Sequence, residues 1–143
     1  MKLSHRSLAV ACMALAGACI AVAAPTPGQK VSNADTVKAY RMDAARFIYA
    51  SYPERVYKGK LPPLMHAIVV TEVEVDSTGA VKDVNMIRTP SHAPDVTVAV
   101  KDMINKASPL PVPSRLGGAK YTEIWLVDKS GRFQLDALTE GQR

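Results

Sequence analysis

The strongest constraint on the fold is an alternating run at the centre of the chain, followed by a tight turn and a second β-branched run. Ala67–Val75 alternates apolar or β-branched residues with Glu72 and Glu74, the period-two pattern of a strand with one buried face. The next four residues end in Gly79, which tolerates the positive φ of a hairpin turn. Val81–Arg88 is then expected to return as the second strand. An antiparallel hairpin is therefore the centre of the predicted fold.

Two helices and two later strands flank this hairpin. Apolar residues at three- and four-residue spacing predict a helix from Val37 to about Ser51, after the N-cap types Ser32, Asn33 and Asp35. A second helix is expected to be capped by Asp95 and to end before the Pro-rich run of residues 108–113. Strands are expected at residues 121–127 and 132–135, joined by a turn at 128–131. The order predicts an α+β two-layer domain, with a mostly antiparallel three- to four-stranded sheet and helices on one face.

The first 23 residues have the three regions of a signal peptide. Met1–Arg6 is short and basic, Leu8–Ala24 is uncharged and apolar, and Ala21-Val22-Ala23 has the small-x-small form of a cleavage site. We therefore expect a signal peptide at 1–23, a short linker at 24–35 and a single domain at 36–143, located in the periplasm. Two alternatives stay open: an uncleaved inner-membrane anchor, and a lipoprotein modified at Cys19. Either one would bring the chain into contact with the membrane.

Charge and cysteine content exclude several classes of protein. The chain carries 18 Lys and Arg against 13 Asp and Glu; without Lys2 and Arg6, 16 basic residues remain. The remaining excess of basic over acidic residues is small and is spread along the chain, which argues against a nucleic-acid partner. Cys12 and Cys19 are the only cysteines, so the expected domain has no disulfide, thiol nucleophile or cysteine-based zinc site.

A search for catalytic and metal-binding patterns finds little. His66 and His92 stand in no metal-ligand spacing, and each is more simply a solvated residue. Glu72 and Glu74 share one strand face, but a solvated sheet face explains them better than an acid–base pair. The run Pro109–Pro113 fits a rigid connector better than a polyproline ligand. We expect no enzyme activity, no cofactor and no metal.

The strand at residues 121–127 is the candidate binding element. Its alternation places Tyr121, Glu123 and Trp125 on one face. Tryptophan is favoured at protein interfaces, but a tryptophan is more often packed in the core of its own domain. If the strand lies at a sheet edge, its backbone can accept a partner strand. The candidate partner-binding residues are Tyr121, Thr122, Glu123, Ile124, Trp125, Leu126 and Val127.

From Tyr52-Pro53 to Leu138, roughly 85 residues, the chain resembles the C-terminal domain of the TonB energy-transducer family. The features that carry the resemblance occur in order: Tyr52-Pro53 after a helix, the alternating strand Val69–Val75, the turn and return Asp76–Val81, the strand Val84–Ile87, the helix start Pro94-Asp95, the Pro-rich break and the strand Tyr121–Val127.

The resemblance implies a periplasmic α+β domain without enzyme activity. It also implies that Tyr121–Val127 pairs with a short peptide from an outer-membrane receptor. The segment from Pro25 to the helix is about ten residues, or about 30–35 Å fully extended, too short to reach the outer membrane from the inner one. We therefore expect an adaptor or accessory in TonB-dependent outer-membrane transport. The alternative is a structural envelope protein that self-associates as a homodimer, through strand pairing or the apolar face of the Val37–Ser51 helix.

Overall fold

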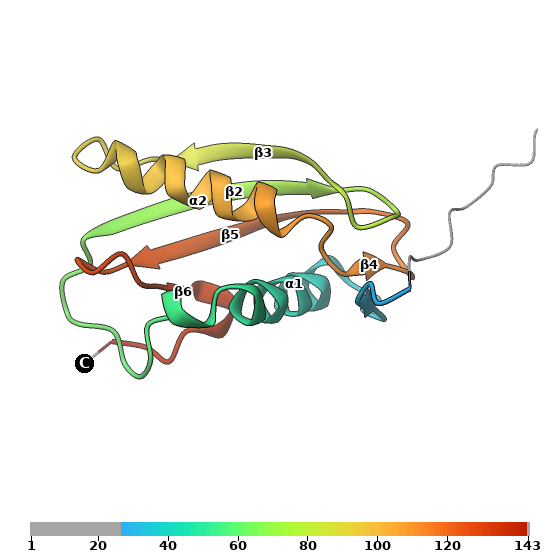
Figure 1. Cartoon of the computed structure of the whole chain (residues 1–143), viewed down its shortest axis with the longest axis horizontal. Coiled ribbons are helices and arrows are strands. Elements are labelled where there is room, and N and C mark those ends of the chain that lie inside the picture. The colour runs from blue at the N-terminus through green and yellow to red at the C-terminus, as the bar shows by residue number, and fades with distance from the viewer. Residues whose placement is uncertain (1–26, 143) are drawn as a thin grey trace, which may run out of the picture.

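The computed structural model describes residues 27–142 as a two-layer α+β domain (Figure 1). Its four-stranded sheet has the order β3-β2-β5-β6, and a separate pair of two-residue strands, β1 and β4, runs parallel. The strands are β1 (Val31–Ser32), β2 (Ala67–Val75), β3 (Val81–Arg88), β4 (Val112–Pro113), β5 (Ala119–Val127) and β6 (Phe133–Leu135). The helices are α1 (Val37–Ser51), α2 (Pro94–Ala107) and the short 3₁₀ helices η1 (Pro53–Arg55) and η2 (Asp136–Leu138). The predicted fold class is confirmed. The expected signal peptide and both cysteines lie outside the described residues.

The long strands follow the predicted alternation. Every second residue of β2, from Ala67 to Val75, is buried, whereas Glu74 is exposed on the outer face. At the turn into β3, Gly79 has a φ of +88°, and Leu110 donates a backbone hydrogen bond to its carbonyl oxygen at 2.8 Å. The hairpin is thereby tied to the connector that follows α2.

The core lies between the helices and one face of the sheet. Trp125, Tyr40 and Phe133 are its largest fully buried side chains, and Trp125 and Phe133 pack with ring centroids 4.8 Å apart. The apolar side of α1 contributes Tyr40, Ala44, Ala45 and Ile48 to this core. Because that side is buried within its own domain, it is not available for the helix-mediated self-association considered above.

The helix starts differ from the prediction. The N-cap of α1 is Thr36, whose hydroxyl accepts from the Ala39 N–H at 3.2 Å, rather than Ser32, Asn33 or Asp35. Ser32 instead donates to the Asp43 carboxylate at 2.6 Å. The second helix begins one residue before Asp95, with Ala93 at the N-cap and Pro94 in the first turn, where the missing N–H of proline costs no hydrogen bond.

The expected linker at 24–35 is partly built into the domain. β1 pairs in parallel with β4, and the Val112 N–H donates to the Lys30 carbonyl at 2.9 Å. Residues 110–113 of the Pro-rich run are buried, as expected of a connector. Among residues 27–142, neither helix has the length and apolarity needed to cross a bilayer.

Candidate functional site

The predicted binding strand is part of β5, and its inward face belongs to the core. Tyr121 is 7% exposed and Trp125 is 1% exposed, while Thr122 is exposed on the outer face. Burial raises the pKa of the Tyr121 hydroxyl above its usual value. A partner strand therefore cannot take its affinity from Tyr121 or Trp125, because both side chains are already covered by their own domain.

β5 is only partly an edge strand. It pairs with β2 along its whole length, whereas β6 pairs with it at Trp125, Leu126 and Val127. The edge expected along all of Tyr121–Val127 is thus closed at its last three residues, because the chain turns back after Val127 and forms β6. Within the described part of the chain, Ala119–Ile124 has a strand partner on its β2 side alone.

The outer side of β6 is closed in turn. The Tyr49 hydroxyl accepts from the Leu135 N–H at 3.0 Å, and the Tyr57 N–H donates to the Phe133 carbonyl at 2.8 Å. The buried Gln134 amide donates to the carbonyls of Tyr57 and Gly59 at 2.9 and 2.6 Å. The bonds of Leu135 and Phe133 satisfy backbone groups of β6 that a partner strand would otherwise use, and the Gln134 bonds hold the segment that contains Tyr57 and Gly59 against this strand.

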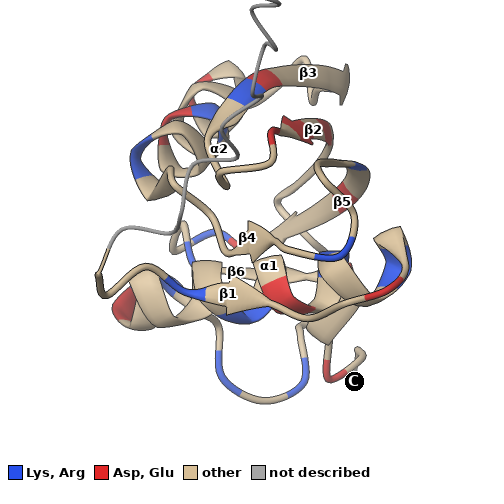
Figure 2. Cartoon of the chain, turned by 90° about the vertical axis from the view of Figure 1, so that its right-hand side faces the viewer, with Lys and Arg blue, Asp and Glu red and all other residues tan. Residues whose placement is uncertain are grey.

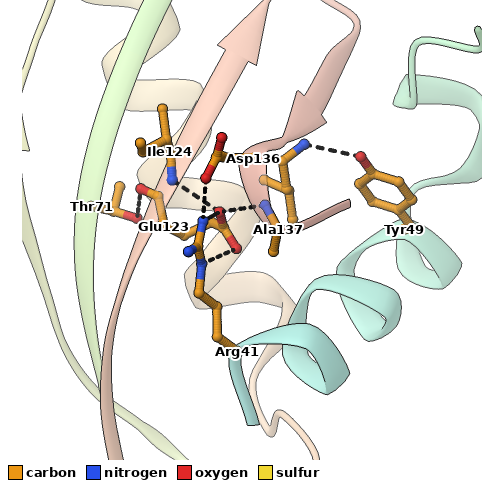
Figure 3. A network of polar contacts seen from close by, with 8 residues as sticks. Arg41, Tyr49, Thr71, Glu123, Ile124, Asp136 and Ala137 are labelled. Carbon is orange, nitrogen blue, oxygen red and sulfur yellow. Dashed lines mark hydrogen bonds and ion pairs between the residues drawn. The ribbon is translucent and has the colours of Figure 1, made fainter. Parts of the chain in front are cut away.

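A buried carboxylate marks the place where the open part of β5 ends (Figure 3). Glu123 is 3% exposed and accepts from Arg41 of α1 at 2.7 and 3.2 Å. It also accepts from the backbone N–H groups of Ile124 and Ala137, at 3.0 and 3.3 Å. Arg41 also forms an ion pair with Asp136 at 2.9 Å. The pKa of Arg41 is raised above its usual value, and the largest contribution comes from its hydrogen bonds to Glu123. We call Arg41, Glu123 and Asp136 the carboxylate cluster.

Alternation predicted that Glu123 shares a face of the strand with Tyr121 and Trp125, but nothing in the sequence identified its partner. Arg41 lies 82 residues away on α1, and only tertiary packing brings the two together. Four donors on one buried carboxylate offset the cost of removing its charge from water. The cluster has the geometry of a structural ion pair that joins α1, β5 and η2.

The other margin of the sheet, β3, is interrupted. Its pairing with β2 shifts register between Val70 and Thr71 and again between Glu74 and Val75. Exposed charges, among them Lys82 and Asp83, stand on the same strand, and Figure 2 shows basic and acidic segments side by side there. Bulges and charges of this kind protect natural sheet edges against added strands.

The sequence also offered Glu72 and the two histidines, His66 and His92, as candidate functional residues. Glu72 is on the outer sheet face, 3.1 Å from the Lys120 ammonium, so it forms a cross-strand ion pair. His66 and His92 do meet, although 26 residues separate them: the His92 Nε2 lies 2.6 Å from the His66 carbonyl oxygen. Within residues 27–142, no three His, Asp or Glu side chains are grouped closely enough to hold a metal.

No protein-family model matches this chain, and no curated protein or solved structure matches it either. The resemblance to the TonB family therefore rests on the ordered residues of the sequence. What the structure establishes independently is the class of fold, a two-layer α+β domain.

Proposed function

We propose that this chain is a periplasmic protein-binding domain that pairs an extended peptide strand with the open part of β5. The observation that carries the proposal is the one-sided pairing of Ala119–Ile124. As the resemblance to the TonB family suggests, the partner is a short segment of an outer-membrane receptor. The role is that of an adaptor or accessory in TonB-dependent transport.

The pattern of hydrogen bonds indicates which backbone groups are available. The Asp128 N–H donates to the Arg132 carbonyl, so even-numbered residues of β5 direct their N–H and C=O groups toward the β6 side. The Ile124 N–H, on that side, is taken by the Glu123 carboxylate. Lys120 and Thr122 are left to receive a partner strand, together with the Ile124 carbonyl.

Energetics limit such a complex to weak binding. Each backbone hydrogen bond contributes a net ~0.5–1.5 kcal/mol, while ordering each peptide residue costs ~1–2 kcal/mol. The two terms nearly cancel, so side-chain contacts must supply the affinity. An open hollow of about 690 Å³ begins at Lys120 and is lined in part by Val37, which is 42% exposed. Val37 is an exposed apolar residue in this lining that could contact a partner side chain, and we expect roughly micromolar binding.

The test uses proline at a position whose N–H does not serve the β2 pairing. Thr122→Pro removes the outward N–H and should abolish binding, while proline remains tolerable on the free side of a strand. Thr122→Ala is the matched control, because it changes the side chain and keeps the N–H. The probes are short synthetic peptides from outer-membrane receptors. Chemical shifts of the β5 amides report binding.

Two results would reject the proposal. The first is that no peptide shifts the amides of Ala119–Ile124. The second is that Thr122→Pro, with an unchanged circular dichroism spectrum, binds as well as Thr122→Ala. If the open segment instead pairs with a second copy of the chain, sedimentation will show a dimer that Thr122→Pro dissociates, and the self-associating alternative takes its place.

A further inference from the structure

We propose that His66 and His92 form a binding site for a copper ion, independently of any strand binding by β5. The two residues lie in different loops, His66 just before β2 and His92 between β3 and α2. Both loops are at the same end of the sheet, because β2 begins where its antiparallel neighbour β3 ends (Figure 1). The hairpin and the turn Pro90–Ala93 thereby bring the two imidazoles together.

The spacing of the rings suits a shared ion. Their centroids are 5.7 Å apart, with an angle of 85° between the planes. A metal–nitrogen bond of ~2.0 Å, plus ~1.2 Å from nitrogen to ring centre, places two imidazoles on one ion ~5–6.5 Å apart, from tetrahedral to linear arrangement. The observed separation falls within this interval, so the ring spacing is compatible with a shared ion.

The hydrogen bond of His92 favours the same use. When its Nε2–H donates to the His66 carbonyl oxygen at 2.6 Å, Nδ1 carries the free lone pair. Metal-ligating histidines usually donate their second N–H to a backbone carbonyl or carboxylate in this way, which holds the ring and fixes its tautomer. His92 is exposed and His66 is half-buried, so an ion can reach both.

The lining of the adjoining hollow selects the metal. A hollow of about 340 Å³ is bordered by both histidines and by the thioether residue Met65, and no carboxylate lines it. Hard cations such as Mg²⁺ and Ca²⁺ require oxygen ligands, whereas imidazole and thioether favour copper. Arg88 also borders the hollow, and its positive charge should weaken binding.

Calorimetric titration with Cu²⁺ at pH 7.5 tests the site. His5, Cys12 and Cys19 would also bind copper, so the full chain is used as the variant H5Q/C12S/C19S, without a histidine tag. We expect one site that His66→Gln and His92→Gln each weaken by about tenfold or more. Arg88→Gln should tighten it by about threefold, because it removes a neighbouring like charge. Met65→Leu should weaken binding of Cu⁺ more than binding of Cu²⁺.

Broadening of amide signals by Cu²⁺ locates the ion. Broadening should centre on residues 65–67 and 91–93, and Zn²⁺ should bind more weakly than Cu²⁺. Broadening centred elsewhere, or an affinity that His92→Gln leaves unchanged, would overturn the proposal. So would the absence of Cu²⁺ binding. If inorganic phosphate then shifts the same amides, the hollow is instead an anion site formed around Arg88.

Discussion

Replacement of Arg41 by methionine tests whether the carboxylate cluster holds the domain together. Arg41→Met keeps an unbranched side chain with high helix propensity in α1 but removes both hydrogen bonds to Glu123, at 2.7 and 3.2 Å. Glu123, whose side chain is 4% exposed, then keeps a buried charge with two backbone N–H donors. The variant isolates the cost of an uncompensated buried carboxylate.

The expected loss follows from burial. Removing one partner of a buried ion pair costs about 3–5 kcal/mol, and the 26% exposure of Arg41 favours the lower end, about 3 kcal/mol. Asp136→Asn removes the other carboxylate of the cluster. Because Asp136 is 47% exposed, that change should cost less than about 1 kcal/mol. For a domain of this size, the Arg41→Met loss corresponds to a fall in Tm of about 10 °C.

Urea unfolding followed by circular dichroism measures Arg41→Met and Asp136→Asn, together with Glu123→Gln and the double variant Arg41→Met/Glu123→Gln. A neutral amide at position 123 still accepts from Ile124 and Ala137 but carries no charge, so the double variant should regain part of the loss. A cost below about 1 kcal/mol for Arg41→Met would refute the reasoning. Strictly additive effects of the two changes would refute it as well, because the cluster would then have no energetic coupling.

Two further substitutions test the hairpin turn. A Cβ on Gly79 would clash with the Leu110 carbonyl oxygen, so Gly79→Ala should cost more than about 2 kcal/mol. Gly131 has a similar positive φ, but a Cβ there would meet only the end of the Arg55 side chain at an ordinary contact distance of 3.9 Å, so Gly131→Ala should cost only about 1–2 kcal/mol. Equal losses in urea unfolding would show that the contact does not matter. The pKa of Asp76 is lowered, mainly by the hydrogen bond from the Thr78 hydroxyl, so its stabilisation is present above the unfolded-state pKa and is lost as pH falls through the folded-state value. Asp76→Asn should therefore flatten the decline of stability below about pH 4, and an unchanged decline in acid titrations would contradict this.

The central hairpin and both helices could be predicted because their patterns are local. Alternation in Ala67–Val75 depends only on which face meets the core, and the helical spacing of α1 depends on the same core. The parallel pair β1–β4 escaped prediction, because each strand has two residues and its pairing joins segments about 80 residues apart. The N-cap of α2 was also missed. Alanine is an unfavourable N-cap residue, but Ala93 takes this position because the helix starts at Pro94.

The candidate site also has features that could be predicted from the sequence and features that could not. Alternation predicted which residues of β5 share a face, including Glu123 with Tyr121 and Trp125, but not that this face is the buried one. The order of the strands was not predictable, because the pairing of β5 with β2 joins segments far apart in the sequence; the pairing of β5 with β6, in contrast, follows from the short turn at residues 128–131. The contact of His66 with His92 likewise depends on two loops that meet only in the folded sheet.

Glu123 connects the stability of the domain with its proposed binding edge. The carboxylate takes the Ile124 N–H three residues before Val127, just where β6 leaves β5, so a partner strand cannot extend past this point without displacing it. The same carboxylate holds Arg41 and the Ala137 N–H, so displacement would expose a buried ion pair and release η2 from β5. That cost, comparable to the loss expected for Arg41→Met, restricts the N–H groups that β5 can offer a partner strand to those of Lys120 and Thr122. The length of β5 open to a partner is therefore set by an interaction that the fold itself requires.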